Sequence, residues 1–411
     1  MKVLMVHSVP LNGGDEALLR ATVEFLRVRW TGMEIAVSCR EVEKCRKRLP
    51  DLDLFPDLEC ASGTEEGVFR GAVEGTRRVL RALGVRETMF RWLDWMTATE
   101  EQKRILRLYG ESDLILSSPG GFFHDHYPVE GRLRGLEAAL DMGKPVILFA
   151  QSIGPFWKKR SRKRVTEVFN RVSRICVRDS LSREHLLDLG VDDSRIRTTA
   201  DAAFLWRQIA PEMFRARSGP VDRIAMSFRI WPHGDATVVV ETVKKAVLLC
   251  RHLLSDAERS LLFLSTCQGI PGYVDDSEVA LRIVEKLPEG LQTRCRVDRE
   301  RYSPRDLIRL LGSCDAFIGM RLHGCLLAML GGTPAMGIGY ESKTSEIFRQ
   351  LGFESFQVGF EKGEEEWLQC AGNFLEQTGE IHNVLAERLD RLCAAADRNL
   401  DAVSECLPGK G

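Results

Sequence analysis

Short apolar runs alternate with longer stretches of helical periodicity along most of this chain, and this alternation constrains its fold more than any other feature. Runs such as 145–150 and 260–265 have the length of buried strands, whereas an apolar stripe marks 16–29 as an amphipathic helix. Parallel strands joined by right-handed helical crossovers give this pattern, so we predict an α/β fold. The predicted strands are 2–9, 35–38, 113–117, 145–150, 174–177, 223–228, 260–265, 315–320 and 334–338.

The length of the chain predicts more than one domain. A chain of 411 residues exceeds what one ordinary core holds. The stretch 211–220 contains Pro, Arg, Ser and Gly between two sets of alternating elements, so we place domains at 1–210 and 211–411. Residues 60–110 are interpreted as an inserted helical segment. The amphipathic stretch 364–403 predicts terminal helices that pack back on the first domain.

Charge and cysteine usage exclude several classes of protein. Lys and Arg total 58 against 59 for Asp and Glu, so we expect no nucleic-acid partner. The 12 cysteines are scattered without a Cys-x-x-Cys pair, which favours reduced thiols over a disulfide framework. The chain has no apolar run of about 18 residues, and its first apolar run is too short for a signal peptide. We therefore expect a cytoplasmic protein.

Ligands of open α/β sheets bind beyond the carboxyl ends of the strands, so the strand-to-helix turns hold the candidate site residues. The first such turn carries Asn12, Asp15 and Glu16 around two glycines. The two acids repel phosphate, so the turn predicts contact with sugar hydroxyls or a general base. The alternative is that both acids only complement the dipole at the start of a helix.

A second turn pairs Gly120 with Gly121 and is followed by His124 and His126. The glycines allow a ligand to approach the backbone closely. We interpret the two histidines as polar residues that line a cleft. A metal site is the alternative, but no matching acidic or cysteine partner lies in range. We predict neither a metal nor a cofactor.

A third turn, 151–156, precedes the strongly basic run from Lys158 to Arg164. Six of its seven residues are Lys or Arg in a chain of nearly zero net charge. One interpretation is a solvated helix face. The other is attraction to a polyanionic or membrane-held substrate, with peripheral contact at the inner face of the membrane.

The fourth turn carries the clearest chemistry. Arg321 and His323 follow the strand 315–320 directly and begin a helix, so a guanidinium, an imidazole and free backbone N–H groups converge. This predicts an anion site with a proton donor. The alternative is that His323 caps the helix while Arg321 forms a salt bridge. Arg229 ends the first strand of the second domain, and Lys343 follows the strand after the Arg321 helix, so both can add positive charge, unless they are surface residues.

At these turns the sequence resembles the polysaccharide pyruvyl transferase family. The resemblance implies a fold like that of B-type glycosyltransferases, with two facing Rossmann-like domains, the acceptor on the first and the donor on the second. It also implies transfer of pyruvate from phosphoenolpyruvate to two hydroxyls of one sugar, forming a ketal, in a polysaccharide or its lipid-diphosphate-linked precursor. The matching blocks are 12–17, 118–121, 151–156, 178–182 with 189–190, 200–204, 319–324 and 340–343.

Applied to this chain, the resemblance identifies Arg321, Leu322 and His323 as the donor-binding segment, with His323 as general acid. Arg229 matches a further donor-binding arginine. Phosphoenolpyruvate carries a carboxylate and a phosphate, so its site needs several fixed cations, and Lys343 supplies another.

The general base is expected from the first domain, with Asp15, Glu16 and Asp201 as candidates. Two other functions stay open on the same residues. A B-type glycosyltransferase or nucleotide-sugar epimerase would use Arg321 and His323 to hold a sugar nucleotide. A non-catalytic relative would only bind glycan.

Overall fold

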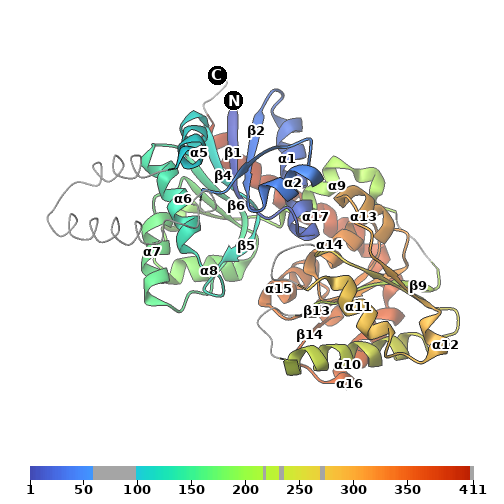
Figure 1. Ribbon diagram of the computed structural model, residues 1–411. Coiled ribbons are helices and arrows are strands. Elements are labelled where there is room, and N and C mark those ends of the chain that lie inside the picture. Colours follow the sequence, from blue (N-terminus) through green and yellow to red (C-terminus); the bar gives the residue numbers. More distant parts are fainter. Residues whose placement is uncertain (59–98, 216–218, 231–235, 269–273, 408–411) are drawn as a thin grey trace.

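The structure is a computed structural model that describes residues 1–58, 99–215, 219–230, 236–268 and 274–407. The described residues form two lobes, each built on a parallel sheet with helices on its faces (Figure 1). This confirms the predicted α/β fold with two Rossmann-like units. The strands of the first sheet lie within 2–198 and those of the second within 223–359, on either side of the stretch 211–220.

The first sheet has the strand order β3-β2-β1-β4-β6-β7-β8, and β5 pairs with β6 beyond this path. Every pairing is parallel because a helix or loop returns the chain to the same edge after each strand. The strands are β1 (Lys2–Ser8), β2 (Glu34–Cys39), β3 (Asp53–Pro56), β4 (Leu114–Ser117), β5 (Gly120–Phe123), β6 (Val146–Ile153), β7 (Arg174–Val177) and β8 (Ile196–Thr198). The α-helices are α1 (Gly13–Arg29), α2 (Val42–Arg48), α5 (Glu100–Glu111), α6 (Glu130–Asp141), α7 (Lys159–Phe169), α8 (Ser180–Asp188) and α9 (Trp206–Ile209).

The second sheet is also parallel and has the order β11-β10-β9-β12-β13-β14. Its central strands are apolar and buried, as sheets covered by helices on both faces require. The strands are β9 (Arg223–Ser227), β10 (Ser260–Leu264), β11 (Cys295–Asp298), β12 (Ala316–Gly319), β13 (Ala335–Gly339) and β14 (Gln357–Gly359). The α-helices are α10 (Ala236–Leu253), α11 (Asp276–Val284), α12 (Glu289–Gln292), α13 (Pro304–Leu311), α14 (Leu322–Leu330), α15 (Ser342–Leu351), α16 (Glu364–Glu376) and α17 (Thr378–Cys406).

Helix α17 joins the two lobes at the end of the chain (Figure 1). Asn399 on this helix is fully buried; it accepts a hydrogen bond from Oγ1 of Thr199 at 2.8 Å and donates one to the carbonyl of Ala200. Glu405 near its end pairs with Arg174 and Arg197 at the edge of the first sheet. The C-terminal helix thus holds the first lobe by buried and charged contacts.

Most of the predicted helical insertion at 60–110 lies outside the described residues. Its end is helix α5, which begins at Glu100 with a Thr99 capping box. The described cysteines are free thiols, and most are buried. None of the described helices has both the length and the apolar character needed to span a membrane.

Candidate active site

The carboxyl edges of the two sheets face each other, and the loops that follow the strands meet between them. The N–H of Gly13, after β1, donates to the carbonyl of Thr266, after β10, at 2.7 Å. Nε2 of Gln350, on α15, donates to the carbonyl of Arg178, after β7, at 2.9 Å. The strand-end loops of the first lobe therefore contact the second lobe, and open α/β sheets bind ligands beyond such strand ends.

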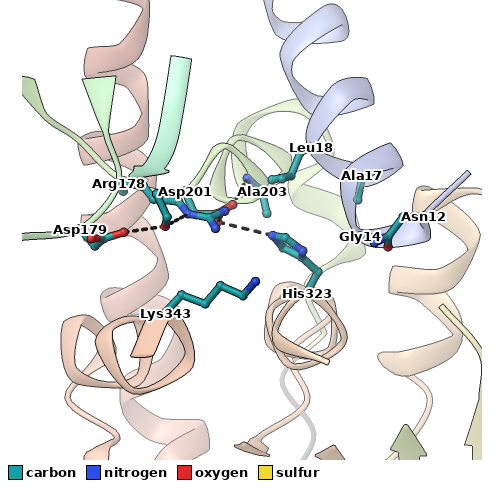
Figure 2. A network of polar contacts seen from close by, with 12 residues as sticks. Asn12, Gly14, Ala17, Leu18, Arg178, Asp179, Asp201, Ala203, His323 and Lys343 are labelled. Atoms are coloured by element: carbon teal, nitrogen blue, oxygen red, sulfur yellow. Dashed lines mark hydrogen bonds and ion pairs between the residues drawn. The ribbon is translucent and has the colours of Figure 1, made fainter. Parts of the chain in front are cut away.

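His323 projects from the second lobe into this cleft. All other residues of α14 are buried, whereas the side chain of His323 keeps 17% of its surface exposed. Its Nε2 lies 3.5 Å from Oδ2 of Asp201 in the first lobe (Figure 2). A Cβ added to Gly14 would lie 2.7 Å from its Nδ1, so a glycine at this position gives the imidazole room beside α1.

Asp201 is fully buried and held on two sides. One carboxylate oxygen accepts the N–H of Ala203 at 2.8 Å, and the other accepts Nη1 of Arg178 at 2.5 Å. Burial raises the pKa of Asp201, but Arg178 and His323 outweigh it and hold that pKa below its ordinary value. Asp201 is therefore a carboxylate at neutral pH and a weak base.

Arg178 is a site residue that the sequence analysis did not single out. It is 2% exposed, and its Nε donates to Oγ of Ser152 at 2.7 Å, which in turn donates to Asp179 at 2.6 Å (Figure 2). Arg178 follows β7 as directly as the predicted residues follow their strands. Its position at a strand end was the signal that would have found it.

Lys343 reaches the cleft from the second lobe, and Arg229 lies at the end of a strand in the same lobe. In Figure 2, Lys343 extends from α15 into the space between Arg178 and His323. Its Nζ pairs with Oε2 of Glu341 at 2.5 Å, and Glu341 raises the pKa of Lys343 although burial lowers it. Arg229 follows β9 and donates to the phenol oxygen of Tyr340 at 2.6 Å.

Arg321 is engaged in the structure by a carboxylate. Its Nε and Nη2 donate to the two oxygens of Asp276 on α11, at 3.0 and 2.6 Å, and the side chain is 8% exposed. This bidentate pair is the salt bridge that the sequence analysis named as the alternative. Leu322 is 4% exposed and belongs to the hydrophobic core, so its side chain does not face the cleft.

The structure separates the two adjacent acids of α1. Asp15 interacts electrostatically with His323 and Lys343, and burial raises its pKa against their pull. Glu16 is 2% exposed and pairs instead with Arg48 of α2, away from His323. Neighbouring residues on a helix point about 100° apart, which sends the two carboxylates to different sides. Only Asp15 joins the cluster around the imidazole.

A cavity of about 270 Å³ adjoins this cluster on the side of Lys343. Its walls come from the loops after β5 and β6, the start of α8 and the start of α15, so both lobes contribute. His124 and His126 line it, as the sequence analysis expected for polar cleft residues. Burial lowers the pKa of His124 to about 4, so this imidazole is neutral at pH 7. Gly121 also lines the cavity.

Two further predicted site residues, Asn12 and Gly120, have roles in the local backbone structure. The side chain of Asn12 accepts the N–H of Gly14 at 3.0 Å and caps α1. Gly120 has φ +155°, a backbone conformation that favours glycine. No group of three or more His, Cys, Asp or Glu side chains suited to a metal ion is found among the described residues.

The basic run 158–164 lies at the start of α7, on the first lobe. Four of its six basic side chains form ion pairs, three with acids outside α7 and one with Glu167 of α7 itself. The pairs are Arg160–Glu130, Arg162–Asp188, Lys163–Glu167 and Arg164–Glu137. These carboxylates offset most of the positive field that the run would present to an anionic surface.

The chain resembles known proteins over most of its length. The family model described as polysaccharide pyruvyl transferase matches residues 12–342. The curated amylovoran biosynthesis protein AmsJ of Erwinia amylovora is 27% identical over 369 residues, covering 86% of each chain.

Solved structures with the same fold include nucleotide-sugar proteins. One is a UDP-GlcNAc 2-epimerase from Neisseria meningitidis bound to UDP-GlcNAc, with a TM-score of 0.57, 11% identity, and coverage of 98% of this chain and 100% of that one. Another is HepE of Anabaena in complex with UDP, with a TM-score of 0.56, 13% identity, and coverage of 98% and 99%. At these identities the likeness concerns the fold alone.

Proposed function

The chain belongs to the polysaccharide pyruvyl transferase family, and we propose that it moves pyruvate from phosphoenolpyruvate onto two hydroxyls of one sugar. The observation that carries the proposal is the contact between His323 and Asp201 across the cleft, with Lys343 and Arg178 beside it. A proton donor surrounded by cations from both lobes suits a small, highly anionic enol ester.

The donor carries a carboxylate and a phosphate, so its binding site needs positive charge and hydrogen-bond donors. Lys343 and Arg229 supply positive charge at strand ends, and the start of α14 supplies free backbone N–H groups. Arg321 is held in place by Asp276, so it adds a fixed guanidinium beside the start of α14. In a dry cleft, fixed donors of this kind stabilise anions without reorganising.

His323 delivers the proton that starts the reaction. Asp201 faces Nε2 and orients the ring, which leaves Nδ1, beside Gly14, as the donating atom. The proton goes to the methylene carbon of phosphoenolpyruvate, and the adjacent carbon becomes electrophilic. Asp201 keeps its negative charge throughout and stabilises the imidazolium, as carboxylates do in hydrolase triads.

A first sugar hydroxyl then adds to the electrophilic carbon, and Asp15 accepts its proton. The carbon–oxygen bond to phosphate breaks, a second hydroxyl of the same sugar adds, and its proton leaves with the phosphate. Of the two hydroxyl protons, one leaves with the phosphate. The other, held by Asp15, returns through solvent to His323, which has given its own proton to the new methyl group. Asp15 suits the role of base because a raised pKa makes a carboxylate a better proton acceptor.

The test is incubation of the protein with phosphoenolpyruvate and a panel of galactosides, mannosides and N-acetylhexosaminides, free and lipid-diphosphate-linked. Phosphate release that depends on one of these acceptors, with an equal amount of pyruvyl ketal, supports the proposal. Release without an acceptor, or no release with any acceptor, counts against it.

A second candidate that the same residues leave open is a nucleotide-sugar enzyme, and the shared fold does not decide between the two. Titration calorimetry separates the two functions without any acceptor. Pyruvyl transfer predicts heat with phosphoenolpyruvate and none with UDP-GlcNAc. The opposite result would favour the nucleotide-sugar function.

A further inference from the structure

The cavity beside Lys343 has the chemistry of a sugar site, not of an anion site. Three carboxylates line it, from Asp179, Glu341 and Glu346, together with the hydroxyl of Ser152 and one cation, Lys343, which pairs with Glu341. Because the acids outnumber this cation, the walls favour hydroxyl groups, whose hydrogen bonds they accept, over a phosphate or diphosphate. The volume of the cavity, 270 Å³, is slightly less than the roughly 300 Å³ of the smallest pockets for drug-sized ligands. A cavity of this volume suits one sugar ring.

A row of aromatic rings leads from this cavity to the surface. His124 is 6% exposed and lies 5.2 Å from His126 between ring centroids. His126 lies 4.8 Å from Trp157, whose ring is 53% exposed. Buried Nδ1 of His124 has no hydrogen-bond partner among the described residues. Together the three rings form a continuous path from the cavity to Trp157.

The exposed ring of Trp157 is attached to a fixed backbone. One carboxylate oxygen of the buried Asp125 accepts the N–H groups of both Trp157 and Lys158, each at 2.7 Å. Asp125 fixes the main chain here, and the edge contact with His126 and Nζ of Lys158, 6.0 Å from the ring centroid, orient the indole, which lowers the cost in conformational entropy on binding. A large aromatic face of this kind binds the C–H-rich face of a sugar while its edge remains wet.

We propose that the cavity and Trp157 form two adjoining acceptor subsites, the cavity for the sugar that receives pyruvate and Trp157 for the next sugar of the chain. This inference rests on the proposed function. It adds that the acceptor is a saccharide of at least two rings, recognised through an aromatic face outside the catalytic cluster.

The test compares methyl glycosides of galactose, mannose, glucose and N-acetylglucosamine with β-linked disaccharides that end in each sugar. Saturation-transfer NMR reports binding without phosphoenolpyruvate, and phosphate release reports KM and kcat. We expect tighter binding of a disaccharide than of its methyl glycoside. Trp157→Ala should remove that preference, raising the disaccharide KM about 10-fold with little change in kcat.

Three controls keep the result interpretable. Trp157→Phe retains an aromatic face and should keep most of the preference. Val28→Ala removes a side chain that is 76% exposed on α1 and should change nothing. His126→Ala interrupts the row between cavity and indole and should weaken the preference in part.

The outcomes also separate this inference from the proposed function. An equal preference in the wild type and in Trp157→Ala, or no saccharide binding at all across the panel, would overturn the inference. If a disaccharide binds through Trp157 but no acceptor supports phosphate release, the subsites stand and pyruvyl transfer fails.

Discussion

His323 of the second lobe lies directly against Gly14 of the first, so close that a Cβ at position 14 would meet its Nδ1 at 2.7 Å. The start of α1 and the start of α14 thus form the cluster only while the two lobes are together. A side chain at position 14 would compete with the imidazole for the same space. The proposed proton donor is therefore positioned by both lobes.

Gly14→Ala tests this contact. We expect turnover to fall about 100-fold, because displacement of the imidazole by a fraction of an ångström to an ångström spoils its alignment. The measurement is steady-state phosphate release from phosphoenolpyruvate with the active acceptor. Gly372→Ala is the matched control, because this glycine lies in α16 with nothing within 4 Å of a new Cβ. It should keep full activity and gain a little helix stability.

Asp15→Asn and Glu16→Gln compare two adjacent acids of one helix turn. Asp15 is the proposed base, and its pKa is raised, so wild-type kcat should fall as the pH drops through that raised pKa. Asp15→Asn should lower kcat at neutral pH and remove this acidic limb. Glu16→Gln should keep the limb, since Glu16 pairs with Arg48 away from the imidazole. A pH profile of kcat for the three proteins checks both expectations.

Asp15→Asn should also make the protein more stable at pH 7. A pKa raised by burial means that ionised Asp15 is less favourable in the folded than in the unfolded chain. This cost in folding free energy is absent at a pH below the ordinary pKa of an aspartate, where the carboxyl is protonated in both states. It is present at neutral pH, and the uncharged amide of Asp15→Asn removes it there. Thermal unfolding should therefore give a higher Tm for Asp15→Asn at pH 7 and no gain near pH 3. An equal or lower Tm at pH 7 would show that Asp15 is not strained by burial.

Asp201→Asn should cost both activity and stability. The amide leaves Arg178 buried without its carboxylate, which costs roughly 3–5 kcal/mol of folding free energy. The pKa of Asp201 is lowered in the folded protein, so its stabilising effect is present at neutral pH and fades as the pH falls below the ordinary range near 4. The difference in Tm between Asp201→Asn and the wild type should therefore become smaller as the pH falls below about 4. Asp298→Asn, a buried acid of β11 outside the cleft, should leave turnover nearly unchanged.

His323→Ala separates chemistry from binding. If His323 is the general acid, kcat should fall about 100-fold or more. Calorimetry should still show phosphoenolpyruvate binding, because Arg229, Arg321 and Lys343 remain. Wild-type turnover in this variant would remove the proposed role.

The sequence predicted the central strands well because they are apolar and buried. The runs 113–117 and 315–320 became β4 and β12 within a residue or two. The short strands β3, β8, β11 and β14 were not predicted, and neither was β5, which pairs only with β6. All are edge strands of three or four residues, and strands of that length and position carry little hydrophobic periodicity.

The sequence predicted only those residues of the candidate site that directly follow a predicted strand. That rule predicted Arg229, His323 and Lys343, which follow β9, β12 and β13 in the structure. The partner of Arg321 was not, because Asp276 lies 45 residues away in sequence and meets it only through the fold. The different surroundings of Asp15 and Glu16 follow from where α2 packs, which no local pattern contains.

The most direct test of the central claim is the reaction run in D₂O with phosphoenolpyruvate and an active acceptor, followed by NMR of the product. We predict one deuterium in the methyl group of the ketal, one phosphate per ketal, and loss of this reaction in His323→Ala. A product whose methyl group carries no solvent deuterium, or an undiminished reaction in His323→Ala, would contradict protonation of the enol ester by His323.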